Sequence, residues 1–343
     1  MAHASRRNFL TTIGRTGAAA LGAAGVSGIG LASRPARAVG KKITARLVLD
    51  LAQDDPRTKG VQRFADLVAK YTDNHVEVQI FPNDILTTEA QAIRLMRDGS
   101  LSMATVGGAL ASLDPMWSFI GMPYLFQSYE SAEKLFEGPT ASELLNLLPK
   151  YDLIGLSFFS DGFRDVTNSR RPIVEPADLA GLKIRVVNSP AWIATFRALG
   201  ANPTPMDFGQ VYMALKTRVV DAQEAAPTTT LMNKFYEGQA YLSLTRHIFQ
   251  PVPLIAGKKF WDGLPNDVQV AMQKAAPEAT RFQRQLIKTA TEASLDQLRT
   301  RGMKINEVDK PAFIKATASV YSEVEANVPG LADLIAKIRA AQA

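Results

Sequence analysis

The stretch from residue 181 to residue 224 alternates strand-like and helix-like segments, and this rhythm constrains the fold more than any other part of the chain. Residues 182–187 alternate apolar and polar side chains and are rich in β-branched residues, which predicts a strand that begins after the turn at Gly181. The segments that follow are a helix over 191–199, an extended connector over 202–205, a helix over 208–216 and a strand over 219–222. Such alternation is typical of an α/β layer that binds ligands at its strand ends.

The part of the chain before this stretch repeats the alternation and predicts a parallel sheet. Strands are expected over 43–51, 75–81 and 101–106, with helices over 59–71 and 87–97 between them. A βαβαβ order implies right-handed crossovers, and the carboxyl ends of its first and third strands then lie at one crevice. Gln53, Glu89 and Gly107 lie at or beside these expected crevice ends.

The remaining elements imply a second sheet region and a helical end. Further strands are expected over 153–159, 240–244 and 248–256, the last interrupted by Pro251 and Pro253 and therefore placed at a crossing or an edge. The other expected elements are a long helix over 264–301, a short strand over 303–305, and helices over 311–325 and 330–340. A chain with this order crosses between two lobes more than once.

The N-terminus carries most of the excess positive charge. Residues 1–38 contain five arginines and no acidic residue. Removing these five from the 39 basic residues leaves 34, against 33 acidic residues, so no nucleic-acid-binding surface is expected. The pair Arg6–Arg7, a weakly apolar stretch and small residues at 36–38 resemble a Tat signal with cleavage after Ala38, which predicts a periplasmic protein.

Signatures of enzymes and of bound metals are absent from the sequence. There is no cysteine, and the chain has no Gly-x-Ser-x-Gly, His-Glu-x-x-His or P-loop motif. Its three histidines, His3, His75 and His247, are scattered. No catalytic residue, cofactor or metal is therefore expected.

Arg185 is unusual because it is a cation inside an apolar strand. Its spacing allows two interpretations: an exposed residue on an alternating face, or a buried cation that binds an anion. A guanidinium offers two parallel donors that match the two oxygens of a carboxylate.

Several motifs in order, GLKIRV, LGANPTPM, VYMALKTRVVDAQE and KFYE, resemble the extracytoplasmic solute receptors of TRAP transporters, the DctP-like family. The resemblance implies a two-lobed α/β fold like that of periplasmic binding proteins, with a ligand cleft between the lobes and a long C-terminal helical region. The lobes are expected over 39–161 plus about 251–290 and over 162–250 plus about 291–343. It also implies an organic acid as the ligand and TRAP membrane permease subunits as partners.

The resemblance points to particular ligand-binding residues. It implies that Arg185 pairs with the carboxylate of the ligand, that Arg164 contacts the same or a second anionic group, and that Phe208 packs on the ligand. For Arg164 the alternative is a surface pair with Asp161 or Asp165, and for Phe208 it is a place in the core. The further candidates are Asn188, which could instead cap a helix, and Trp192, Gln53, Gly107 and Ala225.

At residues 225–226 the sequence departs from the family pattern. The family commonly has asparagine and then proline after Asp-x-Gln-Glu, whereas this chain has Ala225 and Ala226. This loss of a polar side chain predicts a ligand that is bulkier, or less polar at that end, than a small dicarboxylate. An ABC-type periplasmic binding protein and, less favoured, a secreted enzyme that processes an acid remain alternatives.

Overall fold

A computed structural model describes residues 42–83 and 87–342, which belong to one compact unit. The expected signal peptide and its cleavage site lie outside the described residues. Among the described helices, none combines the length and the apolar character needed to cross a bilayer.

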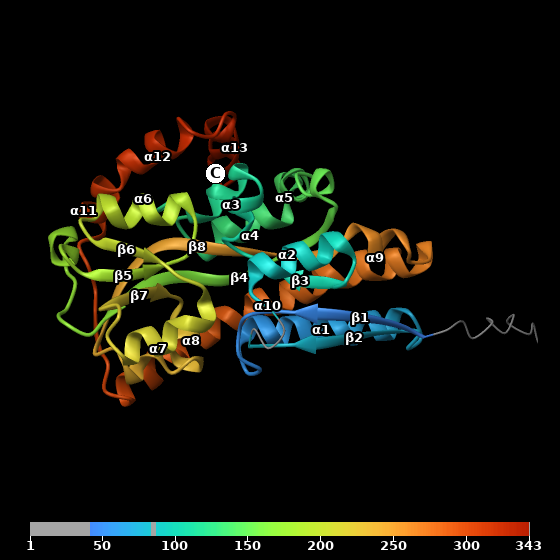
Figure 1. Cartoon of the computed structure of the whole chain (residues 1–343), viewed down its shortest axis with the longest axis horizontal. Coiled ribbons are helices and arrows are strands. Elements are labelled where there is room, and N and C mark those ends of the chain that lie inside the picture. Colours follow the sequence, from blue (N-terminus) through green and yellow to red (C-terminus); the bar gives the residue numbers. More distant parts are fainter. Residues whose placement is uncertain (1–41, 84–86, 343) are drawn as a thin grey trace, which may run out of the picture. The chain divides into compact units, whose positions relative to one another are not determined.

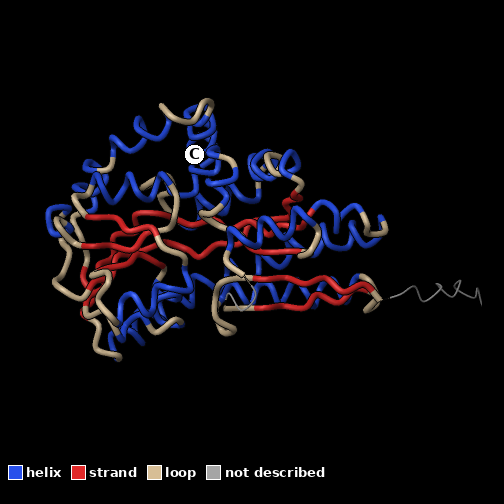
Figure 2. The backbone as a smooth tube through the Cα atoms, viewed as in Figure 1, coloured by secondary structure: helices blue, strands red, loops and turns tan. Residues whose placement is uncertain are grey.

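A single mixed sheet forms the centre of this unit, and helices cover both of its faces (Figures 1 and 2). The strand order is β2-β1-β3-β8-β4-β7-β5-β6, and β9 pairs with β8. The strands are β1 (Ile43–Val48), β2 (Val76–Phe81), β3 (Met103–Thr105), β4 (Leu153–Asn168), β5 (Lys183–Val186), β6 (Asn202–Pro205), β7 (Ala222–Ala225), β8 (Tyr241–Gly257) and β9 (Lys304–Asn306). The sheet is parallel at both ends and antiparallel in the middle, where β8 pairs with β3 and β4, and β4 with β7.

The helices connect these strands and form the C-terminal region. The α-helices are α1 (Pro56–Tyr71), α2 (Glu89–Asp98), α3 (Leu110–Leu113), α4 (Tyr129–Glu137), α5 (Pro139–Leu145), α6 (Pro190–Ala198), α7 (Val211–Lys216), α8 (Pro227–Met232), α9 (Lys258–Asp262), α10 (Asn266–Thr300), α11 (Lys310–Ala316), α12 (Ala318–Glu325) and α13 (Leu331–Gln342). The 3-10 helices are η1 (Pro115–Gly121), η2 (Pro149–Tyr151), η3 (Pro176–Leu179), η4 (Phe208–Gln210) and η5 (Phe235–Glu237).

The expected βαβαβ unit at the start of the chain is confirmed. Strand β1 pairs in parallel with both β2 and β3. Helix α1 begins where the Asp55 side chain accepts a hydrogen bond from the Arg57 backbone N–H. Helix α2 begins with a capping box between Thr88 and Gln91 and ends at Gly99, whose φ of 90° favours glycine.

The two longest strands differ from the expectation. β8 is one continuous strand of 17 residues at the centre of the sheet, where two separate strands were expected. Its prolines Pro251 and Pro253 pair with Ser160 and Phe158 of β4, and β4 has register shifts on both sides of this pairing. These irregularities explain how two residues without a backbone N–H are tolerated in a central strand.

The region around residues 181–225 is more sheet-like than its sequence suggests. The expected connector at 202–205 is strand β6, which pairs in parallel with β5. Strand β7 begins at Ala222, because the chain is still turning at Arg218, with φ 59°, and Val219, whose N–H bonds the carbonyl of Ala214. The expected helix over 208–216 is divided into η4 and α7.

Long helices pack on the sheet and join distant parts of the sequence. α10 continues through Pro277 and packs against α1, and their side chains share an apolar core with β1 and β8. A second core lies among α2, α4, α6 and the C-terminal helices. The expected helix over 311–325 is two helices that meet at Thr317, and α12 contacts α6 whereas α13 contacts α4 and α5.

Candidate functional site

A cavity of about 90 Å³ lies where the carboxyl ends of β1, β3 and β5 meet the middle of β4 and β8. A buried water needs roughly 10–15 Å³, so the cavity has room for a small polar molecule. The residues that line it are Asp50, Leu51, Thr88, Glu89, Ala90, Gly108, Ala109, Ser112, Asp161, Arg164, Arg185, Val187, Asn188, Met206, Asp207, Phe208, Thr229 and Gln250.

Arg185 is a buried cation on the wall of this cavity. It is 3% exposed, which excludes the interpretation of a surface residue on an alternating face. Its Nε and Nη2 donate to the Met206 carbonyl at 3.0 and 2.8 Å, and its guanidinium carbon lies 5.9 Å from the centre of the Phe208 ring. Burial lowers the pKa of Arg185 to about 10, although Glu224 opposes this effect. Among the residues that the structure describes, no carboxylate forms an ion pair with Arg185, so its charge remains available to a ligand.

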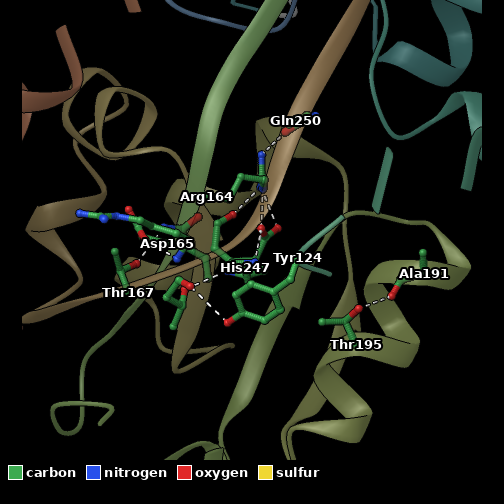
Figure 3. A network of polar contacts seen from close by, with 12 residues as sticks. Tyr124, Arg164, Asp165, Thr167, Ala191, Thr195, His247 and Gln250 are labelled. Atoms are coloured by element: carbon green, nitrogen blue, oxygen red, sulfur yellow. Dashed lines mark hydrogen bonds and ion pairs between the residues drawn. The ribbon is translucent and has the colours of Figure 1, made fainter. Parts of the chain in front are cut away.

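Arg164 also lines the cavity, but its charge is already balanced. Nε and Nη2 donate to the Glu224 carboxylate at 2.5 and 2.7 Å, Nη2 also donates to the Glu224 carbonyl at 2.5 Å, and Nη1 donates to Gln250. Figure 3 shows this network, with Arg164, His247 and Gln250 labelled. Arg164 is therefore not the surface residue paired with Asp161 or Asp165 that the alternative interpretation described.

Glu224 is the centre of that buried network. His247 Nε2 lies 3.2 Å from Glu224 Oε2, and Thr245 Oγ1 lies 2.8 Å from His247 Nδ1. Burial alone would raise the pKa of Glu224, but Arg164 and His247 lower it to about 2. Arg164, Glu224 and His247 come from β4, β7 and β8 respectively, so their contacts fix the position of Arg164 relative to three strands.

Part of the cavity lining carries carboxylates. Asp50 and Asp161 both pair with Arg57, a fully buried residue of α1, and the distance from Arg57 Nη1 to Asp161 Oδ1 is 3.4 Å. Asp161 is 6% exposed, and its Oδ1 has no hydrogen-bond partner among the described residues. Burial raises the pKa of Asp161, and Arg57 opposes this effect.

Glu89 completes this acidic side. Its Oε1 accepts the Gly107 backbone N–H at 2.7 Å and its Oε2 accepts that of Ala109 at 3.2 Å. Burial, together with the charge of Asp50, raises the pKa of Glu89 to about 8. Below, the acidic side means Asp50, Glu89 and Asp161.

Two other predicted residues lie at the cavity with the arginines. Asn188 lines it and makes no side-chain hydrogen bond within the described chain. The N-cap of α6 is Ser189, so Asn188 does not cap this helix as the alternative interpretation had it. Phe208 lines it as well, and its ring lies 5.9 Å from that of Phe235 in a small core.

The other four predicted residues lie outside the cavity lining. Gln53 is exposed, and Ala225 is buried within β7. Trp192 is buried behind Gly108, where a side chain on that glycine would approach both Val187 and the Trp192 ring. Gly107 lies beside the cavity, and a side chain there would meet Gln250 and Glu89.

The sequence reasoning missed most of the carboxylate and hydroxyl groups at the cavity. Asp50 lies two residues after the end of β1 at Val48. This strand was expected to end at residue 51, so Asp50 was assigned to the strand and not to the crevice. A shorter predicted strand would have placed Asp50 at the crevice. Asp161, Thr229 and Gln250 are brought to the cavity by β4, α8 and β8, and no local pattern marks them. Across residues 42–83 and 87–342, no group of three histidine or acidic side chains is arranged to hold a metal ion.

Comparison with known proteins gives a consistent result. The model of the family described as bacterial extracellular solute-binding protein, family 7 (DctP) matches residues 48–327. The 2,3-diketo-L-gulonate-binding periplasmic protein YiaO of Escherichia coli is 35% identical over 293 residues, which are 84% of this chain and 89% of that protein. The C4-dicarboxylate-binding periplasmic protein DctP of Rhodobacter capsulatus is 31% identical over 301 residues, which are 85% of this chain and 89% of that protein.

Solved structures agree in fold as well as in sequence. The sugar acid binding protein DctPAm of Advenella mimigardefordensis, in complex with galactonate, superposes with a TM-score of 0.85 at 32% identity and covers 88% of this chain and 98% of its own. The chain therefore has the two-lobed α/β fold of TRAP periplasmic binding proteins, with a long helix near its C-terminus.

Proposed function

Because the chain belongs to the DctP family of bacterial extracellular solute-binding proteins, we propose that it holds the carboxylate of an organic acid on Arg185 in the cavity described above. The chain is a carboxylate-binding solute receptor of the TRAP type. The observation that carries the proposal is the state of Arg185, a buried guanidinium with no ion-pair partner in the described part of the chain.

The two cavity arginines have different roles in this proposal. Nε and Nη2 of Arg185 both bond one carbonyl oxygen, which orients the guanidinium without neutralising it. A ligand carboxylate supplies the missing negative charge, and burial makes that pairing strong because solvent screening is weak. Arg164 is already neutralised by Glu224, so it acts mainly as a hydrogen-bond donor and as a support for Gln250.

The experiment begins with a thermal-shift screen of monocarboxylates, dicarboxylates, sugar acids, keto acids and aromatic acids, because a ligand that binds only the folded state raises the Tm. Calorimetry with the best acid then compares the wild-type protein with Arg185→Ala and Arg185→Lys. We expect at least a tenfold loss of affinity in the first and no recovery in the second, since an ammonium lacks the two parallel donors.

The matched control is Arg197→Ala. Arg197 lies in α6, is exposed, and pairs at 3.5 Å with exposed Glu323, so its loss leaves acid affinity unchanged. Folding of each variant is checked by circular dichroism. Near-native affinity in both Arg185 variants refutes the role assigned to Arg185.

We also propose that the chain forms two lobes that meet at the cavity and close over the bound acid. The boundaries proposed at 161/162 and 250/251 fall inside β4 and β8, beside the register shift between Ser160 and Gly162. Bending at this irregular point closes the lobes over the acid, and the closed form gains contacts that the open form lacks. Small-angle scattering with and without the acid tests this: the radius of gyration falls on binding.

Export and delivery complete the proposal. The family is periplasmic, and the finer statement is that a Tat signal with Arg6 and Arg7 exports this chain and is removed after Ala38, so that the receptor can pass its acid to a TRAP permease. N-terminal sequencing of the periplasmic protein then begins at Val39, and replacing both arginines by lysine abolishes export. An exported protein that retains residues 1–38 contradicts the cleavage site.

A further inference from the structure

The cavity lining combines a cation that has no ion-pair partner in the described chain with several carboxylates, and this composition restricts the second half of the ligand. Arg185 forms no ion pair with a carboxylate among the described residues, although the exposed Asp207, next to Met206, also lines the cavity. Asp50 and Asp161 line the cavity as well and share the cation Arg57. Glu89 adds a third carboxyl group there, held by two backbone N–H groups. A ligand whose carboxylate lies on Arg185 therefore shares the cavity with these carboxylates.

The acidic side consists of hydrogen-bond acceptors with unused capacity. Asp161 lines the cavity and has Arg57 as its one ion-pair partner in the described chain, so its carboxylate can accept further hydrogen bonds. Each oxygen of Glu89 receives one backbone N–H, and a carboxylate oxygen can accept a further hydrogen bond. A ligand hydroxyl donates to such oxygens, whereas a ligand carboxylate has no proton to donate and carries the same charge.

The lining also contains neutral polar groups. The hydroxyls of Thr88, Ser112 and Thr229 and the amide of Asn188 all line the cavity. Hydroxyls and amides both donate and accept, so they match a chain of hydroxyl groups better than a chain of methylene groups. Apolar contact is supplied by Leu51, Val187 and Met206, and by Phe208 beside Arg185.

We propose that Asp161, with Asp50 and Glu89, selects a polyhydroxylated monocarboxylate by accepting hydrogen bonds from its hydroxyls and by repelling a second carboxylate. This inference rests on the proposed function, because it takes Arg185 as the anchor of the first carboxylate. It separates two ligand classes found among the relatives, since one binds a C4-dicarboxylate and another was solved with galactonate. Asp161 is the specificity-determining residue because it is the most buried carboxylate of the acidic side, 6% exposed, whereas Asp50 and Glu89 are only partly buried.

Matched pairs of acids test this selection. Calorimetry at pH 9, above the raised pKa of Glu89 and below the lowered pKa of Arg185, compares galactonate with galactarate, gluconate with glucarate, and erythronate with meso-tartrate. Within each pair the chain is the same and only the terminal CH₂OH becomes a carboxylate. We expect the best-bound monocarboxylate to bind at least tenfold more tightly than its dicarboxylate partner.

Two variants connect the selection to the acidic side. Asp161→Asn keeps the shape and removes the charge, and we expect it to reduce the preference for the monocarboxylate at least fivefold. Glu89→Gln gives a smaller reduction in the same direction and serves as the second variant if Asp161→Asn does not fold. The control is Asp262→Asn, because Asp262 is exposed and pairs with Lys258 far from the cavity lining; its preference equals that of the wild-type protein.

The outcomes separate this inference from the function on which it rests. Dicarboxylates that bind as tightly as their partners, or an unchanged preference in folded Asp161→Asn and Glu89→Gln, overturn the inference while Arg185→Ala still weakens binding. A protein that binds none of the acids, or one whose binding ignores Arg185, overturns the proposed function and the inference with it.

Discussion

Glu224 Oε2 lies 2.5 Å from Arg164 Nε, inside a network in which neither side chain is more than 6% exposed. This pairing distinguishes the two arginines of the cavity. Arg164 has a permanent counter-ion within the protein, whereas Arg185 bonds only a backbone carbonyl. The cavity thus holds one uncompensated cation, and several consequences can be measured.

Removing the counter-ion of Arg164 should destabilise the protein strongly. In Glu224→Gln the guanidinium stays buried but loses its negative partner, and such a loss costs on the order of 3–5 kcal/mol. The free energy of unfolding from urea titration measures this cost. The control Glu323→Gln breaks the exposed pair with Arg197, and we expect it to change the free energy of unfolding by less than about 1 kcal/mol. Equal effects of the two substitutions would show that the buried pair is not important for stability.

Arg185 and Arg57 should respond in opposite ways to replacement by methionine. Arg185→Met removes a buried cation that has no ion-pair partner in the described chain, so we expect the ligand-free protein to gain roughly 1 kcal/mol while acid binding is lost. Arg57→Met leaves Asp50 and Asp161 without their cation and should cost roughly 3–5 kcal/mol. Thermal melts without ligand measure both effects. A large destabilisation by Arg185→Met would show that the residue is needed for folding rather than reserved for a ligand.

The stability of the ligand-free protein should fall as the pH rises from about 4 to 8. Burial raises the pKa of Asp165 to about 7 and that of Asp55 to about 7, so these carboxyls favour folding when protonated, and this contribution is lost as the pH rises through 7. Between its unfolded and folded pKa values, each of the two carboxyls lowers the free energy of unfolding by up to ~1.4 kcal/mol per pH unit. Glu224 acts oppositely: its pKa is lowered to about 2, so its contribution is present above its usual pKa and is lost as the pH falls toward 2.

The variant Asp165→Asn tests whether Asp165 contributes to the fall in the free energy of unfolding as the pH rises. Asparagine stays neutral at every pH, so the variant should lose part of the fall in unfolding free energy between pH 4 and 7. Asp165 Oδ1 accepts the Arg246 backbone N–H at 2.9 Å, and an asparagine oxygen can accept the same bond. Chemical denaturation at a series of pH values gives the slope, and an unchanged slope in the variant contradicts the assignment.

Gly121 should tolerate no side chain. A Cβ atom at this position would overlap the ring of Trp192, which is fully buried behind the cavity wall. We expect Gly121→Ala to cost about 1–3 kcal/mol, as overpacking in a core does. At Gly263 a Cβ would meet backbone oxygens of Lys259 and Phe260 at 3.5 Å, an ordinary contact, so Gly263→Ala should change stability by about 0.5 kcal/mol or less. A stable Gly121→Ala variant would mean that Trp192 can move.

Local sequence patterns were enough to predict the parallel βαβαβ unit and to single out Arg185, because strand alternation and helix caps act over a few residues. They were not enough to find the partner of Arg164, since Glu224 reaches it only through the pairing of β4 with β7. Gln53 illustrates an error of boundary: β1 ends at Val48, so Asp50 and Leu51 reach the cavity and Gln53 remains exposed. Ala225 was predicted from the family pattern rather than from a strand boundary, and it lies buried within β7, outside the cavity lining.

The partners of Asp161 were also beyond local reasoning. Arg57 lies far from it in the sequence, and only the packing of α1 beneath β4 brings the two together. The tolerance of Pro251 and Pro253 in a central strand depends likewise on irregular pairing in the neighbouring strand. Both features arise from tertiary contacts rather than from the residues next to them.

β4, β8 and α10 each run without interruption through a boundary proposed between the lobes. Neither half of such a molecule is a separable building block, because cutting the chain at any one of these points divides a strand or helix that both halves need. Gene fragments that encode one lobe alone would therefore yield incomplete sheets, and grafting a lobe from a relative would require splicing at three places at once.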